Sequence, residues 1–301
     1  MKKIYSIFPI LSGICFGSLG IFVRDLSKTM NSTTIISSRI IFAVIILGIW
    51  IACFHAEYFK IKLKDIWICV CSGIIGTLGL NICYNFAINE LTLSLSAVLL
   101  SLSPIFVMIF AFFLFGESIT AKKIISVIMA IIGCVLTSGV LESNSGLKWS
   151  GIGILIGGAG AFFYALYSIF SKIGIKRGYT AITITFYSMT VIAIVLLPFT
   201  QWSHIFKFIA VSPVTHVPFM IIHSLCAAVF PYVFYTVSLN HMDAGKASIL
   251  CSCEPVAAMV FGVIFFDEMP TVLSIIGLII VLVALAMLVL QGKEKETIEK
   301  N

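Results

Sequence analysis

A single carboxylate lies within a long apolar stretch near the carboxyl-terminal end of the chain. Glu254 stands near the middle of the apolar segment 244–266 and directly before Pro255. In lipid, a carboxylate at that depth costs several kcal/mol unless it faces a polar cavity, is paired or is protonated. Glu254 could therefore carry a proton or bind a cation. Alternatively, it could only satisfy a carbonyl or a polar side chain that the proline step at Pro255 leaves without a partner.

Two prolines occupy matching positions in the two halves of the chain. Pro104 and Pro255 each lie inside an apolar run, where a proline removes a backbone donor and frees the carbonyl one turn earlier. In lipid such groups must be satisfied by neighbouring helices or by a wet cavity. Paired helix breaks in corresponding positions indicate a central site, although a simple kink is the alternative.

Polar and aromatic side chains share helical faces in several apolar runs. A pocket lined by them would offer hydroxyl groups to a polar substrate and aromatic rings to an apolar or cationic one. Hydrogen bonds between helices would explain the same residues without any substrate. The candidates are Asn81, Tyr84 and Asn85 on one face, Tyr164 and Tyr167 on a second, Tyr235 as the repeat mate of Tyr84, and Ser103.

Two basic side chains also fall within apolar runs. His223 could titrate or act as a gate near the outer mouth of a pathway, or it could be a neutral, hydrogen-bonded packing residue. Arg39 could attract an anionic group near that mouth, or it could pair with backbone carbonyls and extend toward the membrane interface.

The elements that hold these side chains must be membrane-spanning helices. The mean hydropathy is +1.14, and 60% of residues are apolar while 11% are charged. A soluble domain has about 25% charged residues, so the solvent must be lipid. The net charge of +6 comes from basic residues in short loops, where such residues set the orientation of a membrane protein. Because orientation accounts for the basic charge, we expect no nucleic-acid partner.

Ten segments have the length of about 20 apolar residues that a span requires. We predict that the segment 200–218 between the seventh and eighth spans is a connection. The predicted spans are 4–23, 33–54, 66–88, 92–115, 121–140, 150–171, 180–199, 218–239, 244–266 and 272–291. With a cytoplasmic amino terminus, the inner segments hold 14 of the 19 Lys and Arg residues, the outer segments hold 4, and Arg39 lies within a span. The positive-inside rule then places both termini in the cytoplasm.

The chain contains an internal repeat. Residues 84–120 align with 235–271 without a gap, and 10 of these 37 positions are identical. Each copy has five predicted helices, and the odd number makes the second copy run upside down relative to the first. We therefore predict an all-α membrane protein of two inverted five-helix repeats, 5–140 and 150–291, followed by a cytoplasmic tail, 292–301. Inverted repeats are typical of transporters that expose a central site alternately to the two sides.

The repeated segments resemble the EamA-type members of the drug/metabolite transporter superfamily. Both copies show a proline, an apolar run and an acidic ending: LSPIFVMIFAFFLFGESIT at 102–120 and CEPVAAMVFGVIFFDEMPT at 253–271. Asp267 replaces the glycine of the first copy, and Arg39 matches the arginine near the start of the second helix. The resemblance implies a transporter of amino acids, other metabolites, amines or drugs.

Together these features predict a secondary active transporter, not an enzyme. We expect export of a small polar or amphipathic metabolite, such as an amino acid, across the cytoplasmic membrane by alternating access. A proton-coupled transporter of drugs, cations or amines is the alternative, and a membrane enzyme or scaffold is a remote one. The expected partners are the substrate, membrane lipid, a coupling proton and, along the featureless fifth and tenth helices, lipid or a second copy in a homodimer. The nine cysteines have no framework spacing, so we expect neither a metal site nor a cofactor.

Overall fold

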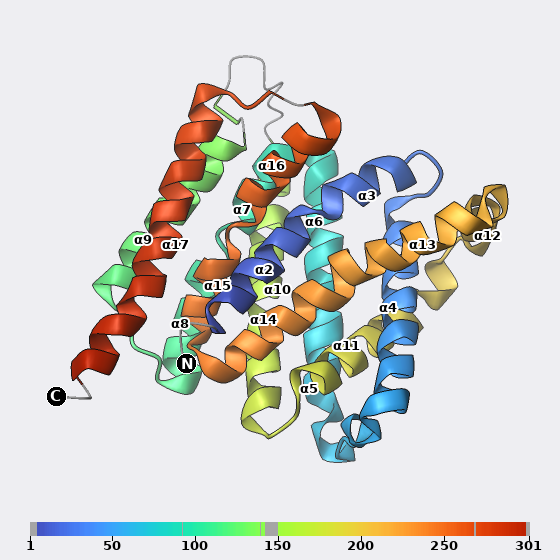
Figure 1. Ribbon diagram of the computed structural model, residues 1–301, viewed down its shortest axis with the longest axis horizontal. Coiled ribbons are helices and arrows are strands. Elements are labelled where there is room, and N and C mark those ends of the chain that lie inside the picture. The colour runs from blue at the N-terminus through green and yellow to red at the C-terminus, as the bar shows by residue number, and fades with distance from the viewer. Residues whose placement is uncertain (1–4, 92, 139, 142–149, 268, 299–301) are drawn as a thin grey trace.

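The computed structural model describes residues 5–91, 93–138, 140–141, 150–267 and 269–298. Every regular element in these ranges is a helix, as the apolar runs predict (Figure 1). Helices dominate because a chain in lipid must satisfy its backbone hydrogen bonds within each segment.

The first half of the described chain consists of helices joined by short turns. Two 3₁₀ turns, Ala56–Phe59 and Leu63–Asp65, precede its third span. The α-helices are α2 (Ile7–Gly17), α3 (Leu19–Leu26), α4 (Ser32–Phe54), α5 (Ile66–Val70), α6 (Gly79–Glu90), α7 (Leu93–Leu100), α8 (Ser103–Phe115) and α9 (Ala121–Thr137), with a π-helical segment, Cys71–Leu78, between α5 and α6.

The second half repeats this plan. A 3₁₀ turn, Leu197–Phe199, ends its second span. The α-helices are α10 (Gly151–Lys176), α11 (Ala181–Leu196), α12 (Trp202–Val211), α13 (Pro213–Ser224), α14 (Phe230–His241), α15 (Ala244–Cys251), α16 (Glu254–Phe266) and α17 (Val272–Ile298), with a π-helical segment, Leu225–Val229, between α13 and α14.

The helices match the predicted spans closely. Nine helical stretches of the described chain are long and apolar enough to cross a membrane, and α9, with 17 residues, packs along α17 to give the tenth. One expectation is wrong: the segment 200–218 is not a plain connection, because it contains α12 and the first turns of α13. The ten residues of α12 are too short to span, and Pro213 stands in the first turn of α13, where a missing N–H is tolerated.

The fourth and ninth spans are each interrupted. The fourth consists of α7 and α8, and the ninth consists of α15 and α16. Pro104 and Pro255 lie in the first turns of α8 and α16, positions at which proline costs no helical hydrogen bond. The interruptions bring four helix ends into the interior of the bundle.

The third and eighth spans each contain a π-helical segment. A π-helix has i→i+5 hydrogen bonds and is found mostly at functional sites. The first segment packs closely on α10, because a Cβ added to Gly76 would lie 2.6 Å from the Tyr167 Cα atom. Only glycine permits this approach, so the sequence of the π segment is matched to its neighbour.

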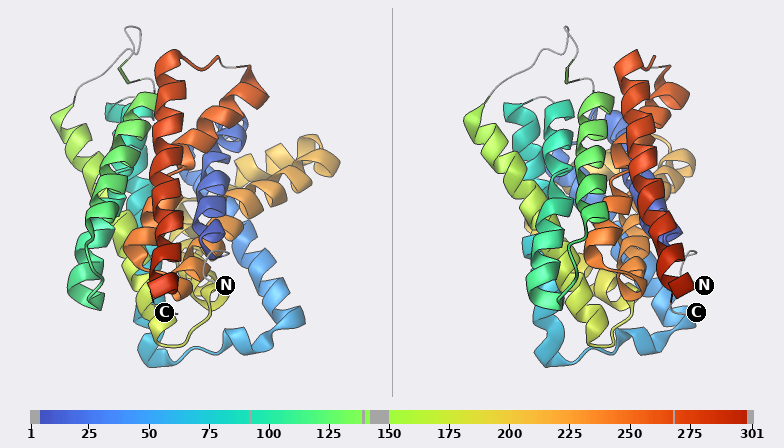
Figure 2. Two further views of the ribbon diagram at one scale, coloured as in Figure 1. Left: turned by 60° about the vertical axis from the view of Figure 1, so that its left-hand side comes forward. Right: turned by 90° about the vertical axis from the view of Figure 1, so that its left-hand side faces the viewer.

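The helices form one bundle with a separate pair at its side. Both termini lie at the same end of the molecule, and α9 and α17 run side by side along one flank (Figures 1 and 2). The first span has three glycines at spacings of four and three residues, Gly13, Gly17 and Gly20, and only part of this face is packed. Added Cβ atoms at Gly13 and Gly17 would meet atoms within 2.7 Å, whereas Gly20 has no atom within 4 Å. The main core lies among α4, α6, α8, α10, α11, α14 and α15.

Candidate functional site

Glu254 is the first residue of α16, at the break within the ninth span. Its carboxylate lies within electrostatic range of Tyr84 in α6, Tyr164 in α10 and Tyr232 in α14. On another side, a Cβ added to Gly17 of α2 would lie 2.7 Å from the backbone oxygen of Glu254. Side chains of three other helices therefore lie within electrostatic range of the carboxylate, and a fourth helix, α2, packs against the backbone of Glu254.

The Glu254 side chain is half-buried. It makes no hydrogen bond or ion pair with a described residue. Tyr84, which lies within electrostatic range of it, is also half-buried. A carboxylate within a membrane span that has no described partner has the chemistry to hold a proton or a cationic group.

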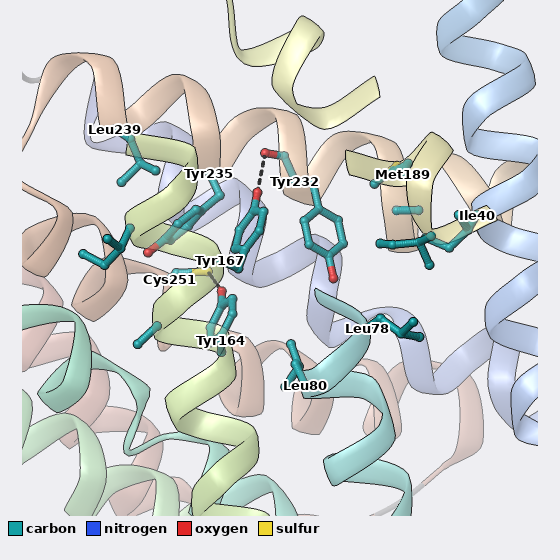
Figure 3. Packing of buried hydrophobic residues seen from close by; sticks show 14 of the residues in the cluster. Ile40, Leu78, Leu80, Tyr164, Tyr167, Met189, Tyr232, Tyr235, Leu239 and Cys251 are labelled. Atoms are coloured by element: carbon teal, nitrogen blue, oxygen red, sulfur yellow. Dashed lines mark hydrogen bonds between the residues drawn. The ribbon is translucent and has the colours of Figure 1, made fainter. Parts of the chain in front are cut away.

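Figure 3 shows a row of tyrosines, Tyr164, Tyr167, Tyr232 and Tyr235, of which Tyr164 and Tyr232 lie within electrostatic range of this carboxylate. The Tyr164 and Tyr167 rings are nearly parallel, with centroids 6.3 Å apart and an interplanar angle of 5°. The Tyr167 hydroxyl is 2.9 Å from the Thr236 hydroxyl, and the Tyr235 hydroxyl is 2.7 Å from that of Ser168. Tyr167 and Tyr235 therefore join α10 to α14, which is the role in hydrogen bonding between helices that the sequence left open for them.

One contact of the row was missed by the sequence reasoning. The Tyr164 hydroxyl lies 3.6 Å from the Cys251 sulfur at the end of α15 (Figure 3). Cys251 also donates to the Ser12 hydroxyl at 3.6 Å, and Ser12 donates to the backbone oxygen of Pro231 at 2.8 Å. Cys251 is free, like the other eight cysteines, but it takes part in this chain of polar contacts. Only its position four residues before Pro255 could have indicated this.

Arg39 is buried, with 5% of its surface exposed. It does not extend to the interface. Its Nη2 atom donates to Asn81 Oδ1 at 2.9 Å, and the Asn81 amide in turn donates to the Thr77 carbonyl at 2.7 Å. The Arg39 Nε atom is buried and has no hydrogen-bond partner among the residues that the structure describes. The guanidinium is thus held mainly by a neutral amide, which leaves its charge uncompensated at short range.

His223 is a packing residue in the interior. It is fully buried, its ring stacks on that of Phe22 at 5.2 Å, and neither ring nitrogen has a hydrogen-bond partner among the described residues. Arg39 lies within electrostatic range. Packing against Phe22 therefore fixes the ring instead of the expected hydrogen bond.

Tyr232 connects the two charged groups. Its hydroxyl lies within electrostatic range of both Arg39 and Glu254. The Phe16 ring packs edge-on against the Tyr232 ring at 5.1 Å and against the Tyr164 ring at 6.5 Å. The site therefore has an acidic part, a basic part and aromatic rings between them.

The remaining candidates have less defined roles. Asn85 is half-buried on the same helix as Asn81, and Ser103 is buried at the start of α8. Glu268, the repeat mate of Glu117, lies outside the described residues. Among the described residues, no group of three His, Cys, Asp or Glu side chains could hold a metal ion.

The fold and the central cluster define a class: multi-pass helical membrane proteins built from two inverted repeats. A family model gives the identity within that class. The EamA-like transporter family matches residues 3–139 and again 151–290. The chain belongs to this family, and its two repeats are two copies of the family's unit.

Curated relatives of similar length are transporters by name. An uncharacterized transporter, YxxF, of Bacillus subtilis is 24% identical over 294 residues, which cover 96% of this chain and 91% of that protein. An uncharacterized transporter of Clostridium kluyveri is 25% identical, covering 94% and 92%. The pseudopaline exporter CntI of Pseudomonas aeruginosa is 22% identical, covering 92% and 93%.

A solved crystal structure has the same fold. It matches with a TM-score of 0.78 at 14% sequence identity, and the match covers 97% of this chain and 98% of that chain. At this identity the likeness extends to the fold alone. The arrangement of helices described above is therefore also found in a solved structure.

Proposed function

We propose that this protein is a secondary active transporter that moves a small polar or amphipathic metabolite, an amino acid or a related compound, out of the cell by alternating access. The observation that carries the proposal is the Glu254 carboxylate at the break of the ninth span, which has no partner among the described residues. Inverted repeats with broken helices at the centre are typical of transporters that bind their cargo there.

The acidic part of the site suits an ammonium group. Glu254 supplies the negative charge, and Tyr84, Tyr164 and Phe16 supply aromatic rings. A cation is attracted both by a carboxylate and by the face of a ring, and more strongly where water is excluded. An amine that enters here would replace the missing partner of Glu254.

The basic part of the site suits a carboxylate. Arg39 is buried with one partner that carries no charge, and its Nε atom has no hydrogen-bond partner in the described part of the chain. An arginine fork pairs well with a carboxylate because two parallel hydrogen bonds form. His223 lies near enough to respond to such a charge. Tyr232 lies within electrostatic range of both parts, which supports the proposal that they act on one substrate.

The direction of transport and the membrane are part of this proposal. One relative is named an exporter, and this supports export. The excess of Lys and Arg in alternate loops, 14 against 4, supports cytoplasmic termini and insertion in the cytoplasmic membrane.

A proton-coupled transporter of cationic drugs or amines is the second candidate. The observation that favours it is the combination of one deep carboxylate with several rings and no second acid nearby among the described residues. In this case Glu254 would exchange a proton for the cation, and Arg39 would only hold Asn81 and α6 in place.

Counterflow in proteoliposomes of the purified protein distinguishes these functions. The panel should contain amino acids, the amines and acids obtained by removing one of the two groups, and nucleosides. For an amino acid transporter, the counterflow rate of the amino acid should exceed that of each truncated analogue by about tenfold or more, because a hydrogen bond to a charged group contributes about 1.5–3 kcal/mol. In the Arg39→Gln variant, the counterflow rates of the amino acid and of the amine should be equal. Equal transport of amine and amino acid by the unmodified protein would favour the second candidate, and no counterflow with any class would argue against both.

A further inference from the structure

A buried ion pair joins the two repeats at the end of the molecule where the termini lie. Glu117 follows α8, and its Oε1 atom is 2.6 Å from Lys172 Nζ in α10. The two side chains are 8% and 9% exposed. Opposite charges this well buried must be held by further hydrogen bonds, because the loss of water is otherwise not offset.

Those hydrogen bonds reach the start of α15. Glu117 Oε1 accepts a hydrogen bond from the Ala244 amide at 2.9 Å, and Oε2 accepts one from the Gly245 amide at 3.3 Å. Lys172 donates to the Met242 carbonyl at 3.0 Å. A carboxylate at a helix amino terminus is favoured by the free amides and by the helix dipole. One side chain of the first repeat therefore caps a helix of the second.

A second ion pair lies beside the first. Lys123 Nζ of α9 is 2.7 Å from Asp243 Oδ2, and Lys123 also donates to the Ser118 carbonyl at 2.9 Å. Asp243 is the residue before α15. Two acid–base pairs thus hold the beginning of the same short helix.

The helix that is held in this way leads to the central site. It has eight residues, Ala244–Cys251, and so is about 12 Å long. Its last residue contacts Tyr164, and Glu254 begins the next helix. At its first turn it packs on α8, because a Cβ added to Gly245 would lie 2.8 Å from Met108 Cγ. The first turn of α15 is therefore held against α8 at the same end of the molecule as the two ion pairs.

The opposite end carries a related contact. Phe115, beside the Glu117 pair, has the Lys176 Nζ atom 4.3 Å from its ring centroid. Its repeat mate Phe266 has the Arg24 guanidinium at 4.2 Å. Equivalent aromatic residues therefore each lie under a cation from the first span of the facing repeat.

We propose that Glu117 and Lys172, together with the capped amino terminus of α15, form a latch that holds this end of the molecule closed and releases when the central site opens toward it. The inference rests on the proposed alternating access, but its test does not depend on a substrate. The latch acts by positioning α15, and neither Glu117 nor Lys172 contacts the cargo.

The experiment measures from which side Cys251 can be labelled. Cys251 is retained as the single cysteine, and a membrane-impermeant maleimide is applied to right-side-out and to inside-out vesicles. The variants are Glu117→Gln, which keeps an acceptor for α15 but removes the charge, and Lys172→Gln. Lys176→Gln is the matched control: it removes the same charge one turn later on α10 beside the same Phe115 ring, and Lys176 has no ion pair with Glu117.

We expect both latch variants to raise the labelling rate from the Glu117 side by about tenfold, within the usual range of coupling between two states, and to lower it from the opposite side. The control should behave like the parent. A rise from both sides would mean general loosening and would overturn the latch, as would an unchanged rate from the Glu117 side. If one variant is not recovered as folded protein, the other carries the same prediction alone. If the latch variants change the labelling of Cys251 as expected but counterflow fails with every substrate, the proposed cargo is rejected and the latch is still supported.

Discussion

At the scale of single residues, the most unusual group in the molecule is a carboxylate without a partner. Glu254 is surrounded by α2, α6, α10 and α14 and makes no hydrogen bond with a described residue. Such a group reduces stability, because desolvation is not offset by a bond. A chain that keeps it therefore gains something other than stability from it.

This reasoning predicts opposite effects of one substitution on stability and on transport. Glu254→Gln and Glu254→Leu should leave the melting temperature unchanged or raise it, because removal of an uncompensated buried charge relieves about 1–3 kcal/mol. Both should abolish gradient-driven accumulation or selectivity for cationic groups. Thermal unfolding in detergent and uptake in proteoliposomes measure the two effects.

The result that would contradict this is a clear fall in melting temperature for Glu254→Leu with normal transport by Glu254→Gln. Glu254 would then act only on the helix break, the alternative that the sequence leaves open. The matched control is Glu90→Gln, since Glu90 is an exposed acid at the end of α6.

The sequence indicated many of the important side chains but not their partners. Glu254, Arg39 and the tyrosines stand out because polar groups are rare in apolar runs. The contact of Arg39 with Asn81 joins positions 42 residues apart, and nothing in either segment specifies that pairing. The sequence indicated Glu117 only as the acidic residue near the end of the repeated segment 102–120. Its contact with Lys172 depends on how the two repeats pack, which a single sequence does not contain.

At the scale of elements, spans were predictable because lipid imposes a length of about 20 apolar residues on each. The two π-helical segments were not, because no side-chain pattern distinguishes a wide turn from an ordinary one. Neither was α12, because ten residues of mixed character between two spans are compatible with a loop. Several helices contact their neighbours closely at glycine residues.

The packing of the first π-helical segment gives a prediction about stability. Gly76→Ala should destabilise the protein by about 1–3 kcal/mol, the usual cost of adding a methylene to a filled core, because the new Cβ would lie 2.6 Å from Tyr167 Cα and 2.8 Å from its nitrogen. Gly158→Ala in α10 is the control, since no atom lies within 4 Å of its Cβ position. Thermal unfolding of the two variants decides the matter, and equal melting temperatures would show that the segment adjusts freely.

At the scale of the whole molecule, the repeats determine how the chain crosses the membrane. An even number of spans, here ten, returns the chain to the side of the membrane on which it starts, and both termini lie at one end of the molecule (Figure 2). Which side of the membrane this end faces follows only from the distribution of Lys and Arg.

The charge distribution predicts the orientation. Reporter fusions or single accessible cysteines after residues 118 and 176 should report the cytoplasm, and those after residues 145 and 205 should report the outside, because the positive-inside rule places the basic loops inside. Membrane-impermeant labelling of intact cells measures this. A signal from outside at residue 176 would reverse the proposed orientation, and with it the assignment of the latch to the cytoplasmic end.

The two π-helical segments also bear on the relation between the two repeats. Residues 225–229 of the second segment correspond to residues 74–78 of the first at an offset of 151, the same offset that aligns the repeated sequence. A π turn holds one more residue than an α turn, so each repeat accommodates extra length at the same place. The wide turn is thus a property that the two five-helix units have in common, at one register, and not a peculiarity of either unit.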